Sequence, residues 1–188
     1  MKIHLIRHGM TIANEKKLYC GSTDLPLSKK GIESLKSLKN DVAFPMADKF
    51  VATGLMRTVM TTQTLYDREP DIILPEWNEF NFGTFEMKSY EQLKDNLAYI
   101  DWISGIDKIS CPNGENRTIF LQRVKIGLEI IKAMDCKSIV VICHGGVIAS
   151  VMEIMFPDEQ NFYEWQPTYG RGYTIEFAKP FKTYLKSI

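Results

Sequence analysis

Two short segments of the chain share one pattern that ends in a histidine and a glycine. Residues 3–9 read IHLIRHG and residues 139–145 read IVVICHG, so both follow I-x-x-I-x-H-G. Each segment places a histidine, His8 or His144, directly after an apolar run that is typical of a buried strand. The chain has three histidines, and two of them occupy this position. If the two strands are neighbours in a parallel sheet, both imidazoles converge on one pocket.

These residue types are suited to binding an anion. Imidazoles and Arg7 can carry positive charge, and a glycine after each histidine lets the backbone approach a ligand closely. A helix that starts just after Gly9 or Gly146 would point its N–H groups at the same place. Two other interpretations are weaker. A single histidine after a strand is more often structural, which is our interpretation of His4, and a zinc site would need a third ligand at metal-like spacing, which the sequence near His8 and His144 lacks.

The elements that would position these residues alternate between strands and helices. Strands are expected over residues 2–6, 49–53, 71–74, 138–143 and 172–177, and helices over residues 28–40, 55–66, 118–134 and 147–155. The alternation predicts an α/β fold, a three-layer α/β/α sandwich with a mostly parallel central sheet. Residues 80–110 mix aromatic residues and glycines around one expected helix at residues 90–96, which indicates a small helical lid. Ligands of such sheets bind beyond the carboxyl ends of the strands.

The composition is that of an ordinary globular domain. Over 188 residues, 23 Lys and Arg balance 23 Asp and Glu, so no basic surface suggests a nucleic-acid partner. No apolar run approaches the roughly 18 residues that a membrane span needs. The four cysteines are scattered without a CxxC pair, which suits reduced thiols in the cytoplasm. We expect one cytoplasmic domain over residues 1–188, a monomer or homodimer with a lid insertion at about residues 80–115.

Six stretches carry a resemblance to a known family. Residues 5–14 (LIRHGMTIAN) are similar to L-x-R-H-G-x-T-x-x-N, residues 21–31 (GSTDLPLSKKG) to G-x-x-D-x-P-L-S/T-x-x-G, and residues 53–61 (TGLMRTVMT) to S-x-L-x-R-x-x-x-T. Residues 79–86 (EFNFGTFE) are similar to E-x-x-x-G-x-W/F-E, residues 113–123 loosely to G-E-S…R, and residues 144–146 to H-G-G. In this order they resemble the histidine phosphatase superfamily, which includes the phosphoglycerate mutases. The departures at Met10, Thr53, Met87 and Asn116 remove no charged catalytic group.

The resemblance implies a reaction in which His8 attacks phosphorus in line and becomes phosphohistidine. Arg7 and Arg57 would grip the phosphoryl oxygens, and these cations should lower the pKa of His8 and favour its neutral form. His144, expected to be cationic, would stabilise charge in the transition state. Neither a cofactor nor a metal is implied, because arginine and imidazolium meet the phosphate charge.

Glu79 is the candidate general acid, which would protonate the leaving alkoxide and then take a proton from the hydrolytic water. Glu76 and Glu86 lie in the same stretch and are its rivals. The interval of four residues from Glu79 to Gly83 matches the family, so we favour Glu79. The resemblance places the substrate-binding residues beside this machinery at Asn14, Cys20, Gly21, Thr23 and Gly145.

The predicted function is therefore that of a phosphomonoesterase whose partner is a small-molecule phosphate ester. The chain is short, like the α-ribazole and broad-specificity phosphatases, so α-ribazole 5'-phosphate is a candidate substrate. A phosphoglycerate mutase is one alternative, although such enzymes usually have longer chains. An inactive phosphate-binding regulatory protein is another, although it would be expected to lose His8 or Glu79. The aromatic segment at residues 163–173 either closes over the substrate or packs against the domain.

Overall fold

Six strands pair into one sheet within residues 1–177 and 182–185, the part of the chain that the computed structural model describes. Their bounds are β1 (Lys2–Arg7), β2 (Lys49–Ala52), β3 (Ile72–Ile73), β4 (Ser138–Cys143), β5 (Gly172–Phe177) and β6 (Lys182–Leu185). The order across the sheet is β3-β2-β4-β1-β5-β6. Strands β3, β2, β4 and β1 are mutually parallel, whereas β5 is antiparallel to β1 and to β6. The expectation of a mostly parallel sheet is confirmed.

The register between β1 and β4 explains the repeated sequence pattern. Across this parallel ladder Ile6 pairs with Ile142, and Arg7 pairs with Cys143. His8 and His144 each come one residue later, so both leave the sheet at its carboxyl edge and at the same level. This is the edge at which ligands of parallel sheets bind.

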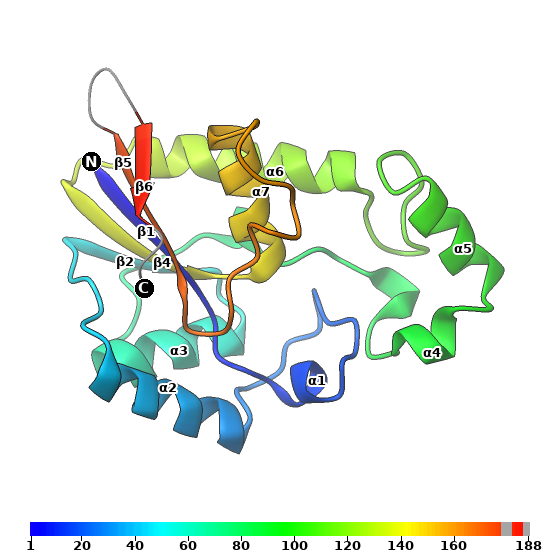
Figure 1. The fold of residues 1–188 in the computed structure, drawn as a ribbon, viewed down its shortest axis with the longest axis horizontal. Helices are drawn as coiled ribbons and strands as arrows, with labels where there is room; N and C mark the ends of the chain where they lie inside the picture. The colour runs from blue at the N-terminus through cyan, green and yellow to red at the C-terminus, as the bar shows by residue number, and fades with distance from the viewer. Residues whose placement is uncertain (178–181, 186–188) are drawn as a thin grey trace.

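Helices cover both faces of the sheet and complete the three layers (Figure 1). One face carries α2 (Lys29–Asp41) and α3 (Met56–Tyr66), and the other carries α6 (Arg117–Lys132) and α7 (Gly145–Met155). The short α1 (Ile12–Glu15) lies at the carboxyl edge. No helix among the described residues has the length and apolar character that crossing a membrane requires.

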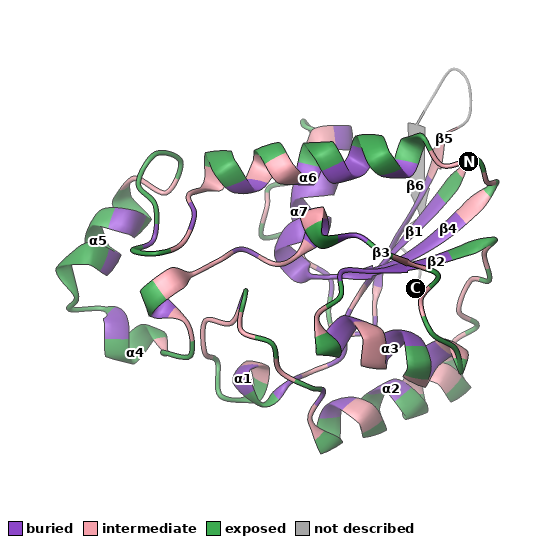
Figure 2. Cartoon of the chain, turned by 180° about the vertical axis from the view of Figure 1, so that it is seen from behind, coloured by how far each residue is buried: buried purple, intermediate pink, exposed green. Residues whose placement is uncertain are grey.

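The central strands are buried on both sides because their side chains alternate between two cores. Leu5 and Val141 point into the core under α6 and α7, whereas Ile6 and Ile142 point into the core under α2 and α3. This is why β1 and β4 are nearly continuous apolar runs instead of alternating ones. Figure 2 shows the same burial along β1, β4 and α7.

A lobe lies at one end of the molecule, where the lid was expected (Figure 1). It contains the 3-10 turn η2 (Gly83–Phe85) and the helices α4 (Tyr90–Leu93) and α5 (Leu97–Ser104). Its inner face carries buried aromatic residues, and much of its outer face is exposed (Figure 2). That this lobe moves as a lid stays a prediction.

Several elements differ from the sequence prediction. Helix α1 was not expected, and the helix expected at residues 90–96 ends at Leu93. Helix α7 begins at Gly145 with His144 as its N-cap, two residues earlier than expected, since a glycine pair is a weak helix signal. A second lobe helix, α5, follows the expected one. Its N-cap is Asn96, whose side-chain oxygen accepts a hydrogen bond from the Tyr99 N–H. The strand at residues 172–177 is not the last, because β6 pairs with it.

Candidate active site

His8 is buried at the end of β1 in a defined tautomer. Its Nδ1 lies 2.6 Å from the carbonyl oxygen of Gly9. A carbonyl only accepts, so Nδ1 carries the proton and Nε2 keeps its lone pair. Burial lowers the pKa of His8 well below its ordinary value, and Arg57 and Arg7 lower it further, against the opposing effect of the Gly9 bond. The expected lowering of the pKa of His8 agrees with these surroundings, with burial and not the cations as the largest cause. Its role as the nucleophile stays a prediction.

His144 lies beside His8, with 5.1 Å between the ring centroids, and its tautomer is also fixed. Arg57 Nε donates to its Nδ1 at 3.4 Å, so Nδ1 is an acceptor. Nε2 then donates to the Thr53 hydroxyl at 3.0 Å, which can donate to Thr58, whose own hydroxyl donates to the Leu55 carbonyl. At one end of this chain of hydrogen bonds Arg57 can only donate, and at the other end the Leu55 carbonyl can only accept. The direction of every hydrogen bond between them is therefore fixed.

The expectation that His144 is cationic is therefore wrong for the unliganded site. The ring is fully buried, and burial followed by the positive charge of Arg57 lowers the pKa of His144 well below its ordinary value. Both ring nitrogens already have partners that suit the neutral form. Sequence reasoning overlooked that the arginine expected to bind phosphate also faces this imidazole.

Arg57 comes from α3 and is held from the opposite side by the loop that follows α1. Its Nη2 donates to the carbonyl of Gly21 at 2.5 Å and its Nη1 to that of Thr23 at 2.9 Å. The carboxylate of Glu86 holds this loop in turn, since it accepts from the backbone N–H groups of residues 21–23 and from the Thr23 hydroxyl. Gly21 has to be glycine, because a Cβ there would lie 1.6 Å from the Phe80 carbonyl oxygen.

Arg7 approaches His8 from the end of β1 and is held by the segment before β5. Its Nη1 donates to the Pro167 carbonyl at 2.8 Å. The ring of Tyr169 lies 4.2 Å from its Cζ, in a cation–π arrangement. The ring centroid of Tyr169 is also 6.1 Å from that of His8. The aromatic segment thus forms part of the site, and Tyr169 is a residue that sequence reasoning did not single out.

Glu79 reaches the same place from the segment after η1 (Pro75–Trp77). Its Oε2 accepts from the Gly146 N–H in the first turn of α7 at 3.0 Å, and its Oε1 accepts from the N–H of Phe80 at 2.9 Å. A Cβ on Gly146 would lie 2.5 Å from this carboxylate. The helix terminus that was expected to face an anion therefore faces the carboxylate of Glu79.

Arg123 on α6 fixes the backbone that carries Glu79. Its Nη1 donates to the carbonyls of Glu76 and Asn78, and its Nη2 donates to that of Glu79 at 2.9 Å. The same guanidinium forms an ion pair with the nearly buried Glu115, with a nitrogen–oxygen distance of 2.6 Å. The loose G-E-S…R match contained both residues, although it gave no indication of this contact.

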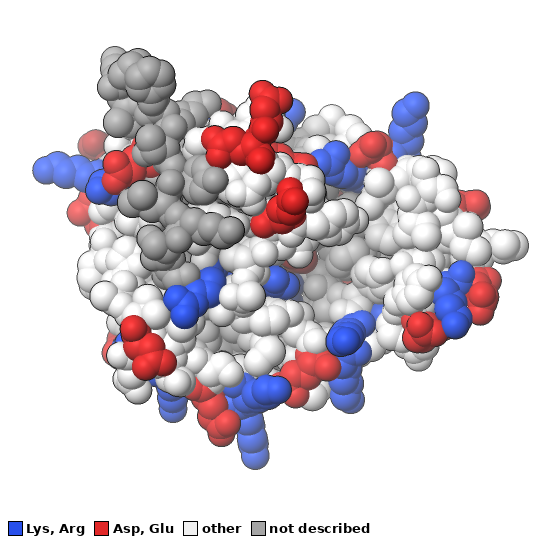
Figure 3. All heavy atoms as spheres, viewed as in Figure 1, with Lys and Arg blue, Asp and Glu red and all other residues white. Residues whose placement is uncertain are grey.

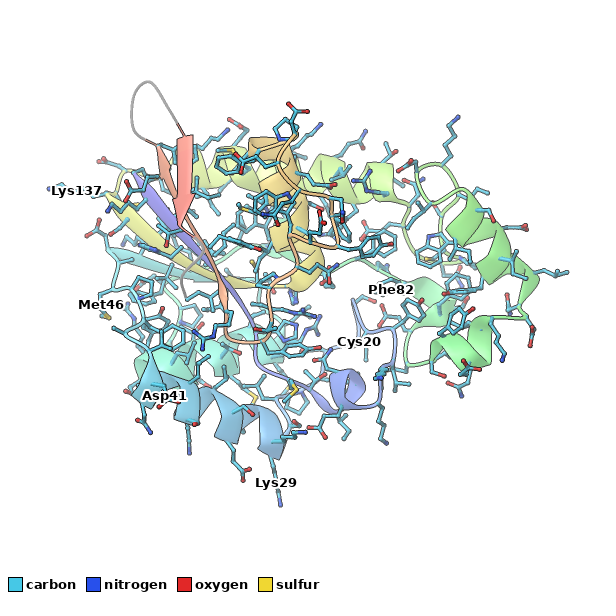
Figure 4. All side chains as sticks on the ribbon, viewed as in Figure 1. Cys20, Lys29, Asp41, Met46, Phe82 and Lys137 are labelled. Carbon is cyan, nitrogen blue, oxygen red and sulfur yellow. The ribbon has the colours of Figure 1, made fainter. Side chains whose placement is uncertain are left out.

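A cavity of about 800 Å³ opens over His8 and extends to the lobe. Figure 3 shows the hollow between the lobe and the rest of the molecule. At the sheet end it is lined by Arg7, His8, Asn14, Glu79, Gly146 and Tyr169. Cys20 and Phe82 also line it, and Figure 4 shows both between α1 and the lobe. The rivals Glu76 and Glu86 do not line it.

The predicted substrate-binding residues are placed unequally. Asn14 and Cys20 line the cavity, although Asn14 also uses its Oδ1 to cap α1. Gly21 and Thr23 support Arg57 from behind, and Gly145 packs against the guanidinium of Arg7. Their roles in substrate binding stay predictions. Within the described ranges, no group of three or more His, Cys, Asp or Glu side chains is placed to hold a metal ion.

Comparison with known proteins agrees with this geometry. The model of the histidine phosphatase superfamily (branch 1) matches residues 3–183. An adenosylcobalamin/alpha-ribazole phosphatase from Salmonella typhimurium is 32% identical over 189 residues, covering 97% of this chain and 94% of that protein. One from Escherichia coli is 33% identical over 154 residues, covering 79% and 76%. The crystal structure of the alpha-ribazole phosphatase from Shigella flexneri superposes with a TM-score of 0.86 at 27% identity, covering 100% of this chain and 96% of that one.

Proposed function

Because this chain belongs to the histidine phosphatase superfamily and is a phosphatase, we propose that it hydrolyses α-ribazole 5'-phosphate through a phosphohistidine on His8. The observation that carries the proposal is the meeting of a neutral imidazole, an arginine and a carboxylate at the closed end of one cavity. His8 Nε2 has its lone pair available there, and Arg7 and Glu79 line the same cavity.

In the first step, Nε2 of His8 attacks phosphorus and the bond from phosphorus to the ester oxygen breaks. Arg7, which lines the cavity, binds the phosphoryl oxygens as charge shifts onto them. Arg57 does not line the cavity and donates to His144, Thr23 and Gly21, so its contact with the phosphate stays a prediction. Glu79 gives its proton to the departing alkoxide. Each of its carboxyl oxygens accepts one backbone N–H, which leaves a second lone pair on each oxygen to hold that proton.

In the second step, the Glu79 carboxylate takes a proton from water, and the resulting hydroxide attacks the phosphohistidine. The bond from phosphorus to Nε2 breaks, inorganic phosphate leaves, and His8 returns to its starting tautomer. The hydrogen bond from Nδ1–H to the Gly9 carbonyl supports both steps, because it keeps the ring oriented and stabilises the positive charge on the phosphorylated ring.

The shape of the cavity favours a phosphatase of a larger ester over a phosphoglycerate mutase. Phosphoglycerates are small and carry several negative charges. The aromatic residues that line the cavity toward its lobe end are Tyr19, Phe82, Tyr99, Trp102 and Phe162, and the charged residues Lys17, Asp107 and Arg117 also line the cavity. These rings are suited to an apolar group, so the proposed substrate is a phosphate ester with an apolar part.

The test is hydrolysis of α-ribazole 5'-phosphate and p-nitrophenyl phosphate in the presence of EDTA, with trapping of the phosphoenzyme in base, where phosphohistidine survives. We expect the wild type to hydrolyse both esters and to trap phosphate, and His8→Ala to do neither. His4→Gln is the matched control, because His4 is held by Thr174 outside the cavity. Equal activity of wild type and His8→Ala would overturn the proposal.

The cytoplasm stays the proposed location, supported by four free cysteines, as expected in a reducing compartment. A monomer or homodimer stays the proposed assembly, and sedimentation velocity at several concentrations tests it.

A further inference from the structure

The two ends of the cavity differ in chemistry, and the proposed reaction uses only one of them. His8, Arg7 and Glu79 line the end that would take the phosphate. The lobe end is lined by two groups of aromatic rings, which come from different segments of the chain. The proposed bond-breaking steps use none of these rings, so their chemistry concerns the rest of the substrate.

The first group of rings belongs to the lobe side and is packed as one unit. Tyr19 and Phe82 have ring centroids 5.0 Å apart, and each packs against Trp102 at 6.3 Å and 6.0 Å. The Tyr19 hydroxyl lies 2.6 Å from that of Tyr99. Because these rings support one another, the wall that they form exists before a ligand binds.

Tyr19 is also fixed through its backbone. Its N–H donates to the Lys88 carbonyl at 2.9 Å, and its carbonyl accepts from the Met87 N–H at 2.7 Å. The segment after α1 is thereby joined to the lobe, and the Glu86 carboxylate joins them again two residues later. The wall is therefore joined to the same loop that holds Arg57.

The second group of rings comes from the segment between α7 and β5. Phe162 and Tyr163 pack edge to face, with centroids 5.5 Å apart, and the Arg117 guanidinium lies over the Phe162 ring at 5.9 Å. Tyr163 lines the cavity while 79% of its surface is exposed. Phe162 and Tyr163 line the same cavity as Tyr19 and Phe82, and among the described residues no ring contact joins the two pairs. We call the part of the cavity between the two pairs the slot.

We infer that this slot, between Tyr19 and Phe82 on one wall and Phe162 and Tyr163 on the other, binds a planar heteroaromatic base carried by the phosphate ester. The inference rests on the proposed function, and it identifies the base as the part of the substrate that the enzyme distinguishes from a simple sugar phosphate. A flat base gains from stacking on ring faces, whereas a sugar phosphate without a base leaves the slot to water. The benzimidazole of α-ribazole is such a base.

The test compares α-ribazole 5'-phosphate with ribose 5-phosphate, which has the same leaving oxygen and lacks the base. The ratio of the two kcat/KM values measures what the base contributes. We expect wild type to favour α-ribazole 5'-phosphate, and Tyr163→Ala to lower the ratio roughly tenfold, as for loss of one stacked ring. Because Tyr163 is exposed, this truncation should leave the fold intact. Phe82→Leu, which keeps an apolar side chain, should lower the ratio as well.

Leu97→Ala is the control, since Leu97 is an exposed apolar residue of the lobe that does not line the cavity. It should keep the wild-type ratio. A wild-type ratio near one, or an unchanged ratio in Tyr163→Ala and Phe82→Leu, would contradict the binding of a base in the slot. Neither result would contradict the proposed chemistry at His8. If His8→Ala hydrolysed both esters as fast as wild type, the proposed function itself would fail.

Discussion

The two histidines at the carboxyl edge are neutral for one shared reason and are held in different tautomers. Burial takes both rings out of water and disfavours their charged forms. His8 carries its proton on Nδ1 and has Nε2 free, whereas His144 carries its proton on Nε2 and accepts at Nδ1. His8 is therefore suited to nucleophilic attack, while His144 helps to orient Arg57.

Glu79 gives the sharpest prediction at the scale of single residues. Glu79→Gln should lower kcat for ribose 5-phosphate by a factor of about 10² to 10⁴, because an alkoxide cannot leave without a proton. With p-nitrophenyl phosphate, whose phenolate leaves unprotonated, the initial burst of nitrophenolate should persist while turnover slows. Stopped-flow absorbance measures the burst. Glu76→Gln is the control, and a burst lost together with turnover would contradict the role of Glu79 as an acid.

At the scale of elements, the site depends on contacts that tie several segments to one another. Glu86 of the lobe holds the loop after α1, and that loop holds Arg57 of α3. Arg123 of α6 holds the segment after η1, which carries Glu79. The polar atoms of Glu86 and of Arg123 are occupied by hydrogen bonds that hold these segments. We therefore assign Glu86 and Arg123 to positioning and neither to contact with the substrate.

Arg123→Lys tests this assignment. Lysine keeps the charge and loses the planar fork that reaches three carbonyls and Glu115, so we expect the free energy of unfolding in urea to fall by about 2 kcal/mol. Because Glu79 is then misplaced, kcat for ribose 5-phosphate should fall roughly tenfold, and the nitrophenolate burst should fall less.

Arg68→Lys is the matched control, since Arg68 pairs with Asp71 at the surface and should change stability by less than about 1 kcal/mol. An equal loss in the burst and in ribose 5-phosphate turnover for Arg123→Lys would indicate general loosening and contradict a specific effect on Glu79.

At the scale of the whole molecule, stability is coupled to the site through the buried histidines. In the unfolded chain His8 and His144 take up protons as the pH falls below about 6.5. In the folded chain their pKa values are lowered, so both take up protons only at a lower pH. The unfolded state then binds more protons than the folded state, and stability must fall as the pH falls.

We expect His8 and His144 together to lower the free energy of unfolding by up to about 3 kcal/mol between pH 7.5 and pH 5.5, since each contributes at most about 1.4 kcal/mol per pH unit below 6.5. His4, whose pKa is also lowered by burial, adds to this fall. Urea unfolding in phosphate-free buffer measures it. His8→Asn should remove up to half of the part that His8 and His144 contribute. A pH dependence that is the same in wild type and His8→Asn would show that His8 is not held neutral by the fold.

The sequence by itself determined the alternation of the main strands and helices and the equivalent positions of His8 and His144 at the ends of two strands. Those features depend on local periodicity and on a repeated motif, and β-sheet register then brings equivalent residues to one edge. Ser28, which caps α2 as expected, is a local signal of the same kind.

Only the tertiary structure decided which carboxylate reaches the cavity and how His144 is charged. Glu79 and Glu86 lie seven positions apart in one stretch, and their different surroundings come from Gly146 and from residues 21–23. The neutral state of His144 follows from complete burial beside Arg57, a residue 87 positions away. Desolvation and hydrogen-bond partners depend on packing between distant segments, which local sequence patterns do not encode.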